Sequence, residues 1–418
     1  MLFTAFQSRN YRLYFFGQSL SLIGTWMQRT AVYWLVYDLS ASAFILGITV
    51  FCAQFPSFLF SMLGGVVSDR YNRFRVLLTT QIASLAQALV LTLLVFIGDY
   101  TVWQILFLSA VLGTINAFDV PARQAMVYDM VYRKEHLPNA IALNSSMVNL
   151  ARLIGPAVSG IVLEKFGAAV CFLSNGLSFV AVIISLLLMR LPPFVPRERT
   201  STVAADLKDG FHYLTRTPEI SKIMLMLACM SLIALPYVTV LPVYAKDIFA
   251  GSASTFGLLN SFVGLGAVSG ALFLAAMKPG TNLKKVLFRA TLLFGVSLIA
   301  FSHIFSLPVG LIFITFSGFG MMAQTTISNT IIQTTVAPVM RGRVISFYAM
   351  AFFGMQPIGG LLIGSIAHAI GAPLAVFIQG VATLVIAMIF FPFLRKDILM
   401  RKQRMKLKQL EEQAVEHT

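Results

Sequence analysis

Long apolar stretches recur along the whole chain and are separated by short polar connections. A transmembrane helix needs about 20 consecutive, mostly apolar residues. Twelve stretches reach that length, so the pattern predicts twelve transmembrane helices. They lie at residues 12–37, 43–68, 76–97, 102–123, 139–163, 168–189, 220–244, 255–277, 286–305, 309–334, 344–369 and 373–394.

One polar break, at residues 190–219, is longer than the others and divides six predicted helices from six. Prolines at its start exclude a continuous helix, and the apolar positions that follow share one helical face. They predict a short amphipathic helix at the membrane surface or under the bundle: Val203, Leu207, Phe211 and Leu214. We therefore expect an N-terminal six-helix bundle, a cytoplasmic linker, a C-terminal six-helix bundle and a basic cytoplasmic tail, at residues 1–190, 191–219, 220–394 and 395–418.

The two halves repeat one another in the same sense. The glycine pattern of residues 154–168 returns 204 residues later, at residues 358–372. Parallel repeats of this kind occur in transporters that are built from two bundles. The predicted fold class is thus an all-α polytopic membrane protein, with twelve transmembrane helices in two parallel-repeat six-helix bundles.

The composition agrees with this fold class. The chain is 58% hydrophobic and 11% charged, whereas soluble domains carry about 25% charged residues. The three cysteines lie inside apolar stretches without paired spacing, so we expect neither a metal site nor a disulfide. Since the chain shows no nucleotide-binding loop, zinc spacing or nucleophile constellation, we expect no cofactor and no enzymatic activity.

A net charge of +15 raises the question of nucleic acid as a partner. However, 27 of the 31 lysines and arginines fall in the termini and connections on one side of the predicted membrane topology. Positive charges gather on the cytoplasmic side of membrane proteins. The distribution therefore predicts both termini in the cytoplasm and membrane lipids, rather than nucleic acid, as the surroundings. The basic tail rests on anionic headgroups or is simply solvated; the sequence leaves both open.

A short charged hinge follows the second predicted helix. Gly65 and Asp69 are four residues apart and share a helical face, so the glycine lets another helix approach while the carboxylate can accept from N–H groups at a neighbouring helix start. Arg70 and Arg73 must stay on the cytoplasmic side. The alternative is a generic positively charged loop.

These twelve spans, the central linker and the pattern Gly65-xxx-Asp69-Arg70-xx-Arg73 resemble the major facilitator superfamily. Other stretches resemble its bacterial branch of enterobactin-type siderophore exporters and macrolide efflux proteins: residues 24–28, 119–125, 137–140, 144–156 and 341–344. Asn72 departs from the family pattern, where glycine is usual. The resemblance implies an inner-membrane transporter that works by alternating access of two rocking bundles.

The resemblance also implies a cytoplasmic gate around the hinge. In the family pattern Asp119, at the end of the fourth span, meets the Arg73 region and locks the outward-open state. The spacing equally allows a local pair between Asp119 and Arg123. Asp69 is expected to cap the start of the eleventh span, near Arg343.

The first predicted span carries a polar stripe with Gln18, Thr25 and Arg29. A charge near mid-membrane is costly unless it meets water or a partner, so Arg29 either faces a cavity or pairs with a neighbouring helix. In a cavity it would bind an anionic group or set the field around a proton site. Asp38 lies near the outer face and is either a proton carrier or a solvated helix end.

By the resemblance, spans one, four, seven and ten line a central cavity. Methionine and aromatic walls with scattered amides suit a bulky amphipathic ligand, although a single methionine more often lies in a core or faces lipid. The candidate cavity residues are Gln18, Thr25, Arg29, Asp38, Asn116, Met226, Met230, Tyr237, Gln324 and Ser328.

The fifth span combines polar and helix-bending residues. Asn149 and Arg152 share a face and predict a polar link between helices, and Gly155, Pro156 and Gly160 predict a kink with close packing. The resemblance makes this the antiporter-type motif; a pure packing role is the alternative.

We therefore expect a monomeric, proton-coupled exporter of a siderophore or amphipathic drug-like molecule. The alternatives are an importer with the same fold, a non-transporting membrane receptor and a lipid flippase.

Overall fold

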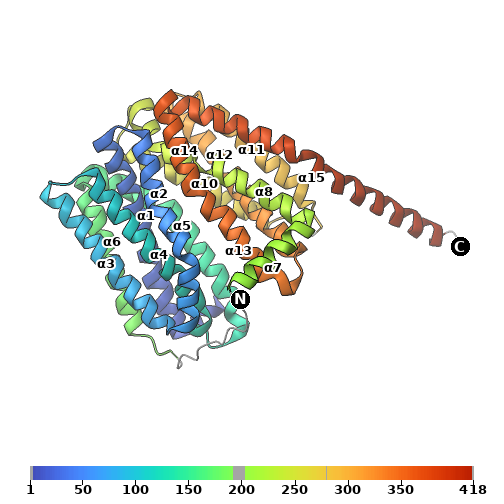
Figure 1. Cartoon of the computed structure of the whole chain (residues 1–418), viewed down its shortest axis with the longest axis horizontal. Coiled ribbons are helices and arrows are strands. Elements are labelled where there is room, and N and C mark those ends of the chain that lie inside the picture. The colour runs from blue at the N-terminus through green and yellow to red at the C-terminus, as the bar shows by residue number, and fades with distance from the viewer. Residues whose placement is uncertain (1–2, 192–202, 279, 417–418) are drawn as a thin grey trace.

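The computed structural model describes residues 3–191, 203–278 and 280–416, without the side chains of residues 203–206 and 395–416. Helices dominate it, and no strand occurs in these described ranges. Two groups of helices stand side by side, one drawn blue to green and the other yellow to red (Figure 1).

The first group contains six long helices. α2 packs along α4, α1 packs against α5 and α6, and α3 lies between α4 and α6. Their bounds are α1 (Arg9–Ser40), α2 (Ala43–Arg70), α3 (Arg73–Ile97), α4 (Val102–Met130), α5 (Leu137–Phe166) and α6 (Ala168–Leu187).

The second group repeats this packing. α10 packs along α12 as α2 does along α4, and α11 lies between α12 and α15 as α3 does between α4 and α6. The repeat read from the glycine pattern is therefore also a repeat of helix neighbours. The bounds are α8 (Pro218–Ile233), α10 (Ala253–Ala275), α11 (Leu283–Ser302), α12 (Leu307–Thr335), α13 (Arg341–Ala349), α14 (Met355–Ile370) and α15 (Ala372–Glu416).

Eleven helical segments in the described part of the chain are long and apolar enough to cross a membrane. The remaining predicted span, α1, is 32 residues long and packs between α5 and α6. Its polar residues, such as Gln18, Gln28 and Arg29, lower its hydropathy. α1 is thus a membrane-length helix whose polar residues Gln18 and Gln28 are buried against protein, while Arg29 is half-buried.

Two predicted spans are not continuous α-helices. After α8 the chain forms a 3-10 turn, η3 (Leu235–Val240), a short α9 (Leu241–Val243) and a π turn, η4 (Tyr244–Ile248). Pro236 and Pro242 account for this break because proline lacks the N–H that continues a helix. Gln379 Nε2 donates to Ile233 O at 2.6 Å and satisfies a carbonyl near the break. A second π turn, η6 (Met350–Gly354), separates α13 from α14.

A helix, α7 (Val203–Arg216), occupies the described part of the predicted linker and docks on α13 of the second group (Figure 1). There Asp209 pairs with Arg343 at 3.2 Å. The rings of Phe211 and Phe347 lie 6.4 Å apart. The linker therefore belongs mechanically to the second group of helices. The remainder of the predicted linker, residues 192–202, lies outside the described residues.

The helix connections gather at two ends of the molecule. The basic end carries the N-terminus and the connections after α2, α4, α10 and α12, and the opposite end carries the connections after α1, α3, α5 and α11.

The two groups touch through glycines in the halves of the helices nearer the opposite end. A Cβ on Gly257 of α10 would lie 2.4 Å from Pro156 O and 2.9 Å from Gly160 Cα of α5. In the repeated contact, a Cβ on Gly364 of α14 would lie 2.6 Å from Ala43 O of α2. Backbones therefore meet at both places, and only glycine fits there.

A third close contact joins α2 to α4 within the first group. A Cβ on Gly64 would lie 1.9 Å from Ala117 O, whereas a Cβ on Gly65 would meet nothing within 4 Å. The close helix approach predicted at Gly65 is therefore wrong for this conformation. The residue that makes it is Gly64, since Gly65 is turned toward open space.

Adjacent glycines of one helix thus provide a matched test. We expect Gly64→Ala to lower stability by about 1–3 kcal/mol, because the new methyl group meets a backbone carbonyl that cannot rotate away. Gly65→Ala should stay within about 1 kcal/mol of the unmodified protein and lean toward stabilisation, since alanine favours a helix. Thermal unfolding in detergent measures both. Equal losses for the two variants would contradict the α2–α4 contact.

Candidate functional site

A cavity of about 1630 Å³ lies between the two groups of helices. Its mouth is at the basic end, where Gly65, Tyr128 and Arg343 line it. Its deep end reaches Pro156 and Phe256, at the level where α5 meets α10. The cavity is therefore open at one end of the molecule and closed at the other.

Every charged side chain among the described residues that line the cavity belongs to an arginine. Arg123 pairs with Asp119 at 3.2 Å, and Arg343 pairs with Asp209. The other two, Arg29 and Arg152, have no ion pair with a carboxylate in the described part of the chain. The cavity consequently has a positive interior.

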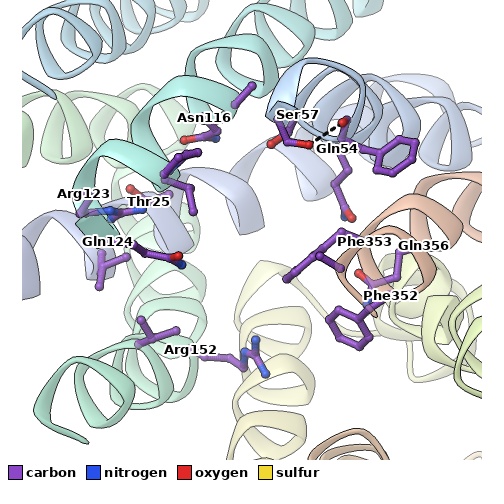
Figure 2. A pocket seen from close by; sticks show the side chains of 18 of the residues that line it. Thr25, Gln54, Ser57, Asn116, Arg123, Gln124, Arg152, Phe352, Phe353 and Gln356 are labelled. Carbon is purple, nitrogen blue, oxygen red and sulfur yellow. Dashed lines mark hydrogen bonds between the residues drawn. The ribbon is translucent and has the colours of Figure 1, made fainter. Parts of the chain in front are cut away.

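Arg29 and Arg152 converge on Trp26. The guanidinium carbon of each lies 5.3 Å from the centre of the indole ring, within the range of a cation–π contact. Arg29 Nε also donates to Tyr33 Oη at 3.1 Å. Figure 2 shows Arg152 projecting into the space between Gln124 on one side and Phe352 on the other. Two like charges therefore share one aromatic ring at the cavity wall.

The buried carboxylate of Asp119 joins α4 to α3. Its Oδ1 accepts from Thr80 Oγ1 at 3.0 Å and Gln81 Nε2 at 2.7 Å, while its Oδ2 pairs with Arg123. The structure thus forms the local pair that the four-residue spacing allowed. The alternative contact with the Arg73 region is not made here.

Arg73 pairs instead with Asp129, at 3.0 Å, and its Nε donates to Ser68 O. Sequence reasoning missed Asp129 because it ended the fourth span at residue 123, whereas α4 continues to Met130. The additional two turns bring Asp129 beside the hinge. Residues 124–130 contain no glycine and no proline. This was the available signal that the helix continues past residue 123.

The remaining gate residues lie around the mouth. Arg70 is exposed at the end of α2, and Asp69 is half-buried. Gly65 and Arg343 line the mouth from different groups of helices. The predicted cap of the α13 start by Asp69 stays a prediction.

Three of the ten candidate cavity residues line the cavity, namely Thr25, Arg29 and Asn116. Gln18 is buried inside the first group. Asp38 lies at the opposite end, where it pairs with Lys246, so the helix-end interpretation describes its position. The remaining five are fully buried within the second group and do not line the cavity: Met226, Met230, Tyr237, Gln324 and Ser328.

These five residues miss the cavity because their side chains lie on other faces of the chain than the faces that line it. No residue of α8 lines the cavity, and Met226 and Met230 pack into the core. α12 turns Met322, Thr325 and Asn329 to the cavity, a stripe that the expected Gln324 and Ser328 adjoin but do not share. One residue along a helix rotates a side chain by about 100°, which is enough to change its surroundings.

The α5 motif combines lining and packing. Asn149, Arg152 and Pro156 line the cavity, but Asn149 Nδ2 donates to Ser145 O of its own helix at 2.9 Å. Asn149 and Arg152 were predicted to form a polar link to another helix. For Asn149 this prediction is wrong, because its side chain bonds within its own helix. A Cβ on Gly155 would lie 2.5 Å from Trp26 Cβ, so that glycine packs α5 against α1.

Sequence reasoning also missed the apolar wall that faces the arginines. Residues of η6 and α12 form it: Met321, Met322, Met350, Phe352 and Phe353. Figure 2 shows Phe352 and Phe353 beside Gln356 on the side across from Asn116 and Gln124. The aromatic run at residues 347–353 was the signal, but a straight helix would have scattered these rings around its axis.

At the opposite end, polar contacts hold the two groups together. Asp38 pairs with Lys246, Tyr37 Oη donates to Asp247 Oδ2, and Ser252 Oγ donates to Glu164 Oε2 at 3.0 Å. Lys246 and Asp247 lie in the π turn η4, which positions both toward α1. These contacts close the end that the cavity does not reach.

A family model described as transmembrane secretion effector matches residues 2–417 of the chain. The staphyloferrin A transporter of Staphylococcus aureus is 28% identical over 400 residues, covering 95% of this chain and 98% of that protein. The enterobactin exporter EntS of Shigella boydii is 24% identical and covers 85% of each chain. Macrolide efflux protein A of Streptococcus pyogenes is 21% identical, covering 91% of this chain and 96% of that protein.

A solved structure of a bacterial homologue of the human lysosomal transporter Spinster, inward-facing and unoccupied, matches with a TM-score of 0.72. It is 15% identical and covers 93% of this chain and 97% of that chain. The nucleoside transporter NupG also matches with a TM-score of 0.72, at 13% identity, over 92% of this chain and 98% of that chain. At these identities the likeness establishes the fold.

The ion pair at the opposite end yields a test. Lys246→Glu should replace an attraction to Asp38 by a repulsion and favour opening of that end. Because both side chains are partly exposed, we expect a shift of only about two- to fivefold. The readout is the labelling rate of Leu235→Cys, at the deep end of the cavity, by an impermeant thiol reagent added from the opposite end.

The double variant Asp38→Lys with Lys246→Glu restores opposite charges and should return the labelling rate to its original value. An unchanged labelling rate in both the single and the double variant would show that the pair does not hold this end closed.

Proposed function

This chain belongs to the transmembrane secretion effector family of the major facilitator superfamily, and we propose that it is a proton-coupled exporter of a siderophore or an amphipathic drug-like molecule. Members of this family are membrane transporters of small molecules and not enzymes. The finer features of the proposal are its direction, its coupling ion and its substrate.

The single observation that carries the proposal is the cavity that opens at one end only. Glycine contacts and polar pairs close the opposite end. At the basic end the helices stand apart around the mouth of the cavity. A rocking motion about the glycine contacts would exchange the open and closed ends, which is alternating access. All walls of the cavity come from one chain, so the proposed transporter works as a monomer.

The direction is inferred from relatives and from charge. Two of the similar proteins are named for export, of enterobactin and of macrolides. The distribution of lysines and arginines supports a cytoplasmic-membrane protein with both termini, and hence the basic end, in the cytoplasm. In that orientation the cavity faces the compartment from which an exporter collects its substrate.

Asp119 is the strongest candidate for the residue that carries the coupling proton. It is the one carboxylate that is buried among the described residues, at 3% exposure, and its partner Arg123 lines the cavity. Proton uptake by Asp119 would release Arg123 toward the cavity, and loss of the proton would restore the pair. Asp38, the other candidate, is exposed at the opposite end.

Purified protein in proteoliposomes tests the proposed transport. We expect enterobactin, staphyloferrin A or a macrolide to accumulate when the pH gradient drives protons against the substrate's direction. A protonophore should abolish the accumulation. Absence of gradient-dependent flux for all three would contradict a proton-coupled exporter of these classes. Binding without flux would indicate a receptor, and movement of labelled phospholipid alone would indicate a flippase.

Asp119→Asn tests the coupling site. The amide keeps the size of the carboxylate, so we expect the protein to fold and to exchange labelled for unlabelled substrate across the membrane. Accumulation driven by the pH gradient should fall at least about tenfold, because the side chain no longer binds a proton. The matched control is Asp129→Asn, which removes the Arg73 pair at the surface. Full gradient-driven accumulation by Asp119→Asn would exclude this residue as the carrier.

A further inference from the structure

The cavity combines a cationic wall and an apolar wall that come from different groups of helices. Arg29, Arg123 and Arg152 belong to α1, α4 and α5 of the first group. The methionines and phenylalanines of η6 and α12 face them from the second group. A molecule that fills both walls must therefore carry an anionic part and an apolar part.

Two of the arginines lack the carboxylate that would neutralise them. Arg123 and Arg343 each hold an acidic side chain, but Arg29 and Arg152 form no ion pair in the described part of the chain. Arg152 Nε is buried and has no hydrogen-bond partner among the described residues. A guanidinium with an unused donor in a low-dielectric cavity is a binding group for an anion.

Trp26 fixes where that anion would sit. Both guanidinium carbons lie 5.3 Å from its ring centre, so the indole ring partly stabilises two charges that repel each other. Gly155 permits this arrangement, since any larger residue would collide with Trp26 Cβ at 2.5 Å. The Arg29–Tyr33 hydrogen bond fixes the other guanidinium. The two arginines are thus held near one another before a ligand arrives.

We propose that Arg29, Arg152 and Trp26 form an anion clamp for the substrate. The substrate class is an amphipathic organic anion whose carboxylate, or a similarly charged oxygen group, bridges the two guanidiniums. Its apolar part packs on Met321, Met350 and the rings of Phe352 and Phe353. This assignment names the substrate class of the proposed transport cavity and therefore rests on the proposed function.

The clamp has a consequence for the transport cycle. Without a ligand, two neighbouring cations repel each other at the deep end of the cavity, next to the α5–α10 contact. A bound anion removes the repulsion and brings the apolar wall of the second group toward the cationic wall of the first. Substrate binding would thereby favour closing of the mouth.

The test compares two probes that differ only in charge, 2-naphthoate and 2-naphthamide. Binding is measured by calorimetry with the full chain in nanodiscs of neutral phosphatidylcholine, against empty nanodiscs and without any pH gradient. We expect naphthoate to bind at least about tenfold more tightly than naphthamide. Because the measurement needs no transport, its outcome is independent of the proteoliposome experiment. Equal affinities for the two probes would overturn the clamp.

Variants locate the effect. Arg29→Gln and Arg152→Gln should each weaken naphthoate at least about tenfold and leave naphthamide within about twofold, since only the charge contact is lost. Arg75→Gln is the matched control, because that arginine is exposed and does not line the cavity; both probes should change less than about threefold. Equal weakening of both probes by the first two variants would reduce these arginines to a structural role.

Two additional arms identify the source of the anion. Chloride in place of gluconate, at constant ionic strength, and phosphatidylglycerol in the nanodiscs should each leave naphthoate binding unchanged within about twofold. Displacement of naphthoate by chloride would assign the clamp to an inorganic ion, and displacement by the anionic lipid would assign it to a headgroup; either result overturns the proposed substrate class. The comparison of the two probes on the unmodified protein remains decisive if a variant fails to fold.

Discussion

The architecture depends on direct backbone contact between the two groups of helices. Inside a membrane no hydrophobic force favours one apolar helix surface over lipid, so close packing must hold helices together. Here Gly257 meets Pro156 and Gly160, and Gly364 meets Ala43 and Gly47. These contacts lie in the halves of the helices toward the opposite end. The other halves diverge, and the cavity occupies the space between them.

The glycine repeat assembles the two groups of helices. Residues 160 and 364 are 204 positions apart, and each packs its helix against a helix of the other group. In the proposed transport cycle these two contacts would also act as a pivot, about which one end opens while the other closes. The polar contacts of Asp38 and Tyr37 with η4 then bias the molecule toward the observed conformation. The Asp38–Lys246 pair is partly exposed on both sides and therefore modest in strength, as a reversible closure requires.

Much of the fold follows from the sequence because membrane burial imposes long apolar stretches and one-sided positive charge. The parallel repeat and the amphipathic helix α7 were likewise visible as spacing. The site was less predictable. A polar stripe pointed to Arg29 and Thr25, which line the cavity, because α1 is an uninterrupted helix. The broken segment after α8 and the π turn η6 changed which other residues meet the cavity. Asp129 was missed because α4 is longer than the membrane is thick. The pairing of Arg152 with Trp26 joins α5 to α1, and no local pattern encodes such a contact.

The central claim is that one cavity alternates between the two ends, and the distances between the ends test it most directly. Spin labels on Tyr71 and Val339 report on the basic end, and labels on Ile97 and Phe305 report on the opposite end; all four side chains are exposed. In a background without Cys52, Cys171 and Cys229, double electron–electron resonance measures both distances with and without 2-naphthoate and across a pH change. We expect opposite changes: the distance at the basic end shortens as the distance at the opposite end lengthens. Two distances that stay fixed, or change in the same direction, would contradict it.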